Sequence, residues 1–381
     1  MFETLHRAIP YLIVDIILLV LFVKDQQYKR HFGRSNDILI KLAYLILLLF
    51  IGLRGFVMTD FISYFPFYGM IDDIESLPEV ILIKGWEPGF IIYSYLCKLI
   101  APNYFAWNFL SAAIDLLIIY IIFKRYSCNH LFSLIVFFIV EGLTIEMNVL
   151  RQAKAIMIFL LAIRYIEKRE LLKYSLMIVF ASFFHLSSIF LWPLYFIIHK
   201  KIPVYGLSLI FLCGIVVLFG NISFISKLIG LFPIGLTDET RVTVFLDRFS
   251  DGESYKLSLG TIERIITYLI MSVIYTKRLE RGDTDVIFYN MYICFFIVFF
   301  YCSESHYILQ RLQYFFIPSF WIMYPSLFKY IRLKGQHLEV ILCIFLAIKA
   351  IMIGSNPANR YENIMFGVES FEKRHSAIDF R

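Results

Sequence analysis

Three arginines and a lysine stand at the ends of strongly apolar segments of this sequence. Arg54 closes one segment in "GLRGF", Arg151 opens another in "NVLRQAKAIMIFLL", and Arg311 lies near the start of a third in "SHYILQRLQYF". A charged side chain deep in a bilayer costs about 2.5–3.5 kcal/mol, so it normally faces a cavity or a partner. Lys154 follows Arg151 by one helical turn on the same face, with Gln152 beside them, at a helix start that also favours anions. The pattern predicts a site for a phosphate-like group, although snorkelling to lipid headgroups also explains any single arginine.

Acidic and imidazole side chains form a second set of candidates, for general acid or base chemistry. Asp60 lies in "TDFISYFPFY", Glu87 in "GWEPGF" and His185 in "FFHLSS". Such a group must reach a reacting hydroxyl, with a pKa moved toward neutrality by burial. A structural role is open for each: a helix cap for Asp60, an arginine partner for Glu87 and a hydrogen-bonded turn for His185. The sequence does not rank the three, and we give a small preference to Asp60.

The composition places these residues in a membrane protein. The chain has 381 residues, of which 60% are apolar and 17% are charged, outside the range of soluble globular domains. The net charge of +6 comes from short basic clusters between apolar stretches. Such clusters set membrane topology, so we expect no nucleic-acid partner.

Apolar stretches long enough to cross a bilayer as helices recur along the chain. They cover about 8–23, 38–54, 105–123, 131–146, 148–165, 204–221, 261–276, 285–302, 307–328 and 338–353. The stretch 174–198 is long for one span and short for two, and polar residues interrupt its middle. Together these stretches predict an all-α, polytopic helical bundle.

The distribution of basic residues predicts the orientation of the bundle. Short basic connections such as "KDQQYKRHFGR" and "RYIEKRELLK" belong on the cytoplasmic side. The sides then alternate only if 174–198 enters the membrane and returns as two short, half-depth helices, with His185 at the tip. This gives about 12 membrane segments. We predict one multispan domain over 1–353 with outer loops at 55–104 and 222–260, and an outer tail at 354–381.

The order and spacing of several motifs resemble the EpsG family. The motifs are "LRGFVMTDFISYF", "WEPGF", "NVLRQAKAIMIFLLAIRYIEKRELLKY", "FASFFHLSSIFLWPLYF" and "QRLQYFFIP". EpsG proteins are similar to Wzy-type polymerases of O-antigen and exopolysaccharide. Residues 38–200 carry most of the likeness, and the last third contributes mainly through Arg311. Lys154 departs from the apolar or small residue expected at its position, which makes its role less certain than that of Arg151 and Gln152.

The resemblance implies an activity. Wzy-like polymerases act at the periplasmic face of the bacterial inner membrane, on repeat units linked to undecaprenyl diphosphate. They are similar to multispan (GT-C-like) glycosyltransferases that use no metal or cofactor. On this basis Arg54, Arg151 and Arg311 form a diphosphate clamp, with Gln152 and Lys154 in support. The implied partners are the lipid-linked glycan, membrane lipids and a chain-length regulator of the Wzz type.

The aromatic residues of the first outer loop are candidates for stacking against sugars. Tyr64 and Tyr68 follow Asp60 at helical spacing, and Trp86 precedes Glu87. An aromatic belt at the membrane interface is the commoner explanation of such residues.

Two other functions remain open from the sequence. An O-antigen ligase, or another transferase that uses polyprenyl-linked sugars, would share the arginines but use a different acceptor. A flippase for lipid-linked oligosaccharides would need internal repeats or polar residues through the full depth of the membrane. The charges here gather near one face, which favours the transferases. The identity of the sugars, the linkage, the chain-length control and the oligomeric state are not encoded in these patterns.

Overall fold

The computed structural model describes residues 2–220, 222, 259–280, 286–303, 306–331 and 335–379. Within these ranges the regular structure is helical apart from two isolated β-bridges, which confirms the predicted all-α class. The predicted outer loop 222–260 lies almost entirely outside them. The chain forms two compact units, Met1–Trp192 with Tyr324–Arg381 and Pro193–Met323.

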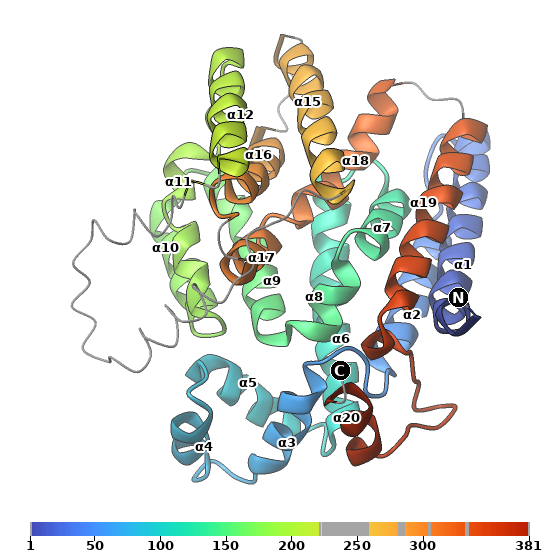
Figure 1. Cartoon of the computed structure of the whole chain (residues 1–381), viewed down its shortest axis with the longest axis vertical. Helices are drawn as coiled ribbons and strands as arrows, with labels where there is room; N and C mark the ends of the chain where they lie inside the picture. The colour runs from blue at the N-terminus through green and yellow to red at the C-terminus, as the bar shows by residue number, and fades with distance from the viewer. Residues whose placement is uncertain are drawn as a thin grey trace. The chain divides into compact units, whose positions relative to one another are not determined.

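The first unit joins both ends of the chain. Figure 1 shows α1 and α19 side by side, and the last turn of α19 packs against the first turns of α1. A Cβ on Gly354 would lie 2.6 Å from the carbonyl oxygen of Thr4, so only glycine permits this close approach. The principal helices are α1 (Phe2–Phe32), α2 (Asp37–Gly52), α6 (Tyr104–Tyr126), α9 (Leu150–Glu167), α10 (Leu171–Ser182) and α19 (Gly335–Ser355).

Asparagine caps define where several of these helices start. Asn36 Oδ1 accepts hydrogen bonds from the amides of Ile38 and Leu39 in the first turn of α2. Asn103 accepts one from the amide of Ala106 in α6. These amides have no partner within their helix, so the caps fix the start of each apolar run.

By length and composition, α6 is the described helix that can cross a membrane alone. The bent pair α7 (His130–Ile139) and α8 (Gly142–Asn148) would add another if the two helices form one span. Helix α9 has 18 residues but carries four charged ones, Arg151, Lys154, Arg164 and Glu167. Helices α2 and α12 (Val204–Phe219) have only 16 residues each. The apolar helices agree with a membrane protein, while the count of about 12 segments and the GT-C-like arrangement stay predictions.

Two stretches predicted as single helices are broken. The stretch 131–146 forms α7 (His130–Ile139) and α8 (Gly142–Asn148), which meet at 63°. Glu141 adopts a left-handed conformation at the break, and a Cβ on Gly142 would lie 2.3 Å from the carbonyl oxygen of Phe137. The stretch 307–328 forms α17 (His306–Tyr314) and α18 (Pro318–Ile331), because Pro318 begins a new helix.

Within the first unit the stretch 174–192 folds back on itself, and the half-depth membrane pair over 174–198 stays a prediction. After α10 the chain is extended at His185, and a 3₁₀ helix η1 (Leu186–Leu191) returns beside α10. The Tyr174 hydroxyl donates to the carbonyl of Leu191 at 2.6 Å, and Trp192 Nε1 donates to Ser175 Oγ at 2.9 Å. These bonds join the two ends of the fold.

The stretch 55–104, predicted as an outer loop, is a helical layer and not an irregular connection. Its helices pack through aromatic side chains: the ring of Phe67 lies 4.7 Å from that of Trp86 and 5.9 Å from that of Phe90, between centroids. Figure 1 shows this layer beside α20. The helices of the layer and the tail are α3 (Phe61–Met70), α4 (Leu77–Lys84), α5 (Pro88–Lys98), η2 (Pro357–Asn359) and α20 (Phe371–Asp379).

The tail is bonded to the residues that follow α2. The amide of Gly55 donates to the carbonyl of Glu362 at 2.8 Å, and the amide of Met58 to that of Ala358 at 2.9 Å. The buried guanidinium of Arg374 donates to the carbonyls of Phe56, Ala358 and Arg360. The tail therefore determines the path of the chain between α2 and α3.

The second unit is a smaller set of apolar helices. Asn290 Nδ2 donates to the carbonyls of Ile198 and Lys200, and Tyr275 stacks on Tyr289 with ring centroids 3.5 Å apart. Its described helices are α11 (Leu194–Ile197), α12 (Val204–Phe219), α15 (Leu259–Glu280), α16 (Val286–Tyr301), α17 and the start of α18.

Candidate functional site

Arg151 stands in the first turn of α9, at the point that the sequence marks as a helix mouth. Its Nη1 donates to Glu87 Oε2 at 2.7 Å, and its guanidinium lies 4.7 Å from the centre of the Trp86 ring. The backbone amide of Arg151 donates to the Tyr64 hydroxyl at 3.4 Å. The side chains of Arg151 and Glu87 are 24% and 19% exposed. The arginine is therefore held in one orientation while part of it still reaches the surface.

Glu87 joins Arg151 to the break in the 174–198 fold. Its second oxygen, Oε1, accepts from the amide of Leu186 at 3.0 Å, so both carboxylate oxygens are engaged. The amide of Phe90 donates to the carbonyl of Phe183 at 3.2 Å. A Cβ on Gly89 would lie 2.6 Å from Phe183 Cβ, so the "WEPGF" motif needs glycine to dock against the break.

Asn148 brings the start of α3 to the start of α9. Its Oδ1 accepts from the amide of Thr59 at 3.0 Å, from Thr59 Oγ1 at 3.1 Å and from the amide of Asp60 at 3.1 Å. Asp60 holds the N-cap position of α3, but its side chain does not cap the helix. Burial raises the pKa of Tyr64 to about 12, and the charge of Asp60 also raises it. Asp60, Tyr64 and Arg151 thus lie within one electrostatic neighbourhood.

His185 lies at the extended turn between α10 and η1, next to the amide that binds Glu87. Its Nδ1 is hydrogen-bonded to Ser187 Oγ at 2.6 Å, and the residue is half-buried. This contact matches the structural alternative predicted for it. His185 directly precedes Leu186, whose amide donates to Glu87. It therefore lies near the ion pair between Glu87 and Arg151.

Lys154 and Arg54 occupy a buried charge network, separate from the contacts of Arg151. The Lys154 ammonium pairs with Asp115 of α6, and the two side chains are 5% and 2% exposed. The Arg54 guanidinium donates to the carbonyl of Ile51 and to Asn108 Oδ1, and it is 2% exposed.

Glu146 of α8 completes the network. It is 2% exposed and interacts electrostatically with Asp115, Lys154 and Arg54. The sequence motifs did not single out Glu146. Asp115 is an interhelical contact, but it binds a residue of the predicted clamp.

The remaining candidates differ in how far they reach the surface. Gln152 is completely buried in α9, and Tyr68 is buried with its hydroxyl bonded to the carbonyl of Ala101. Tyr64 is 4% exposed, and its ring lies 5.0 Å from that of Trp86. Trp86 is half-buried and carries Arg151 on its face. Of the predicted sugar-stacking residues, only Trp86 reaches the surface to this extent.

Arg311 belongs to the second unit, in the last turn of α17, and is half-buried. Its meeting with Arg54 and Arg151 therefore stays a prediction. Among the described residues, no group of three histidine, cysteine, aspartate or glutamate side chains converges as a metal site. Metal independence is a separate prediction.

These features define a class: an all-helical protein with apolar helices of the membrane type, in which the helical layer 55–104 meets the arginine-bearing start of α9. The chain belongs to the EpsG family, a Wzy-type polymerase family whose model matches residues 37–364. The match covers every candidate site residue. No curated protein and no solved structure gave a match.

Proposed function

We propose that this protein is a polysaccharide polymerase that joins repeat units linked to undecaprenyl diphosphate at the periplasmic face of the bacterial inner membrane. In the proposed reaction, a hydroxyl oxygen of the incoming unit attacks the anomeric carbon of the growing chain. The bond from that carbon to the diphosphate breaks, a base takes the hydroxyl proton, and undecaprenyl diphosphate leaves. The product serves O-antigen or exopolysaccharide synthesis.

The observation that carries the proposal is the state of Arg151. Its guanidinium is fixed by Glu87 and Trp86, and the side chain is 24% exposed. A guanidinium has five N–H donors, so an arriving oxyanion can accept from donors that Glu87 does not use. A preorganised cation also stabilises the charge that develops on a leaving diphosphate.

The geometry supports different roles for the candidates. We assign Arg151 to the diphosphate and Glu87 to holding Arg151, since both oxygens of Glu87 are already bonded. Asp60 and His185 remain the candidates for the base. Lys154 and Gln152 support the start of α9 from its buried side, and Arg54 anchors the loop before α3. Arg311 keeps its place in the proposed clamp from the sequence pattern alone.

A reconstitution with purified protein tests the proposal. Lipid-diphosphate repeat units of the producing strain should be converted into a ladder of products without added metal. Absence of a ladder would contradict the mechanism. So would polymerase activity that requires Mg²⁺ and is abolished by EDTA. In the cell, deletion of the gene should leave single repeat units on the acceptor. Bare acceptor would instead identify a ligase.

A further inference from the structure

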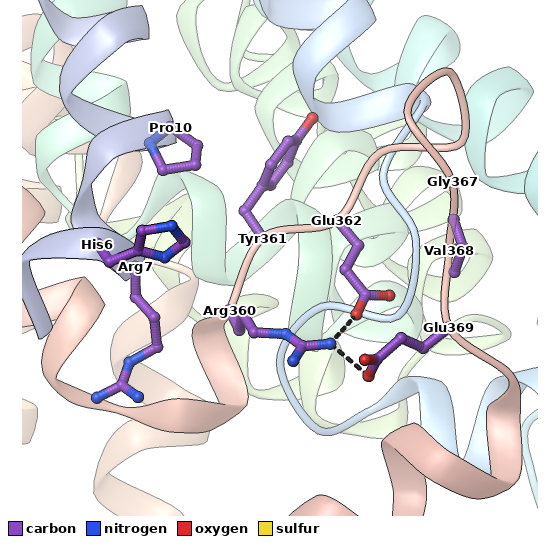
Figure 2. Close-up of a pocket in the computed structure, with 9 residues that line it drawn as sticks. All are labelled: His6, Arg7, Pro10, Arg360, Tyr361, Glu362, Gly367, Val368 and Glu369. Carbon is purple, nitrogen blue, oxygen red and sulfur yellow. Dashed lines mark hydrogen bonds and ion pairs between the residues drawn. The ribbon is translucent and has the colours of Figure 1, made fainter. Parts of the chain in front are cut away.

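A pocket of about 500 Å³ lies between the start of α1 and the tail, outside the site described above. Figure 2 shows His6, Arg7 and Pro10 on one side of it, and Arg360, Glu362 and Glu369 among the residues of the other. Pockets of roughly 300–1,000 Å³ accommodate small molecules. All of the lining residues belong to the first unit, so the pocket is a feature of one compact body.

The polar groups of this pocket are held in place. Arg360 pairs with both Glu362 and Glu369, as the dashed lines in Figure 2 mark. Arg7 Nε donates to the carbonyl of Gly354 at 2.9 Å. A pocket whose donors and acceptors are fixed before binding loses less entropy when a ligand enters.

One acceptor in the wall is unsatisfied. Glu362 is 9% exposed, and its Oε1 binds Arg360, but its Oε2 is buried with no hydrogen-bond partner among the residues that the structure describes. A buried carboxylate oxygen without a donor is costly. A hydroxyl group entering the pocket would supply the donor after a small rotation of the Glu362 side chain.

The balance of charges selects the class of ligand. Arg7 and Arg360 are offset by Glu362 and Glu369, so these four side chains sum to no net charge and favour neither anions nor cations. Hydroxyl groups both donate and accept, which matches a wall that mixes carboxylates with guanidinium and imidazole groups. Pro10, beside His6 and Arg7, offers an apolar face to the C–H side of a sugar ring.

We propose that this pocket binds a sugar residue of the glycan that the protein elongates. The inference rests on the proposed function, because the tail must then lie on the same side as the glycan. The pocket adjoins the predicted site: the backbone carbonyl of Glu362 accepts from Gly55, the residue after Arg54. A glycan held here would stay near the enzyme between successive additions.

Binding to the full-length protein in lipid nanodiscs tests the inference. The probe is a lipid-free oligosaccharide cut from the surface polysaccharide of the producing strain, followed by saturation-transfer NMR. Glu362→Gln removes the charged acceptor and should weaken binding about tenfold, the loss expected for one hydrogen bond to a charged group. Glu372→Gln, an exposed carboxylate of α20 outside the pocket, should leave binding unchanged.

A second variant protects the test against unfolding. His6 is exposed on α1, so His6→Trp should narrow the pocket without disturbing the core, and it should also weaken binding. Unchanged affinity in both pocket variants would overturn the inference. A lipid in the pocket would also overturn the inference. It would appear as a signal from the glycerol headgroups of phosphatidylglycerol nanodiscs that the oligosaccharide does not displace.

Failure of this inference can be told apart from failure of the proposed function. If the deletion strain still makes full-length polymer, the protein is not the polymerase, whatever the pocket binds. If the polymer is lost but neither Glu362→Gln nor His6→Trp alters oligosaccharide binding, the polymerase assignment stands and only the pocket assignment falls.

Discussion

Substitutions at the contact between Arg151 and Glu87 distinguish two roles for the Glu87 carboxylate. If Glu87 only holds the arginine, its loss acts through Arg151, whereas a catalytic base would act on its own. The pair is partly buried, with side chains 24% and 19% exposed and a 2.7 Å contact. A charge-assisted bond of this kind contributes about 1.5–2 kcal/mol, between the values of exposed and fully buried pairs.

These magnitudes give distinct expectations for the substitutions. Arg151→Ala removes a donor to the leaving diphosphate and should lower kcat about 100–1,000-fold. Glu87→Gln keeps the shape of the side chain and should lower kcat about tenfold, as Arg151 spends less time in position. In the double variant the loss should equal that of Arg151→Ala alone, because the role of Glu87 has already disappeared.

The assay is initial-rate formation of the product ladder by purified protein with lipid-diphosphate repeat units. Glu79→Gln, an exposed carboxylate of α4, is the matched control and should retain full activity. Thermal unfolding in detergent shows that each variant is folded. Multiplicative losses in the double variant would refute the positioning role, and normal turnover by Arg151→Ala would refute the diphosphate site.

Other parts of the first unit give further predictions. Gly89→Ala should destabilise the protein by about 1–3 kcal/mol through overpacking, while Gly69→Ala, with nothing within 4 Å of its new Cβ, should not; thermal unfolding compares them. Arg374→Ala leaves buried carbonyls unpaired and should release the tail to protease at a cost of about 2–4 kcal/mol; equal protease resistance would contradict this. A hydrogen bond from Lys373 is the main cause that lowers the pKa of Glu369 below its ordinary 4.5. The ion pairs of Glu369 therefore stabilise the tail fully above pH 4.5, and this stabilisation is lost as the pH falls through the lowered pKa. Tail amides should then exchange hydrogen faster in acid. Glu369→Gln should abolish this pH dependence.

The positions of most helices were predictable because apolar runs and their polar boundaries are local properties. The turn near His185 was also predictable, since polar residues interrupt the apolar stretch there. The breaks near Glu141 and Pro318 were missed. The left-handed turn at Glu141 depends on the contact of Gly142 with Phe137, which hydropathy does not register.

The candidate site was predicted in its residue types more than in its pairings. Motifs distant in sequence meet as Arg151, Glu87 and Leu186, but the sequence alone could not assign the partner of each charge. Lys154 and Asp115 were both visible as charges inside apolar segments, and the cost of burying either one alone favours a pair. That signal was available, but several acids could have served as the partner.

The difference between Arg151 and Lys154 follows from their depth on one helix. Lys154 points into the bundle, where Asp115 compensates its charge and removes its freedom to meet a substrate. Arg151, one turn earlier, reaches the rim, where its planar fork lies on Trp86 while Glu87 binds one end of it. A guanidinium has five N–H donors, so one carboxylate does not exhaust it. Arginine at the rim and a paired lysine in the interior therefore suit the proposed diphosphate site at the start of α9.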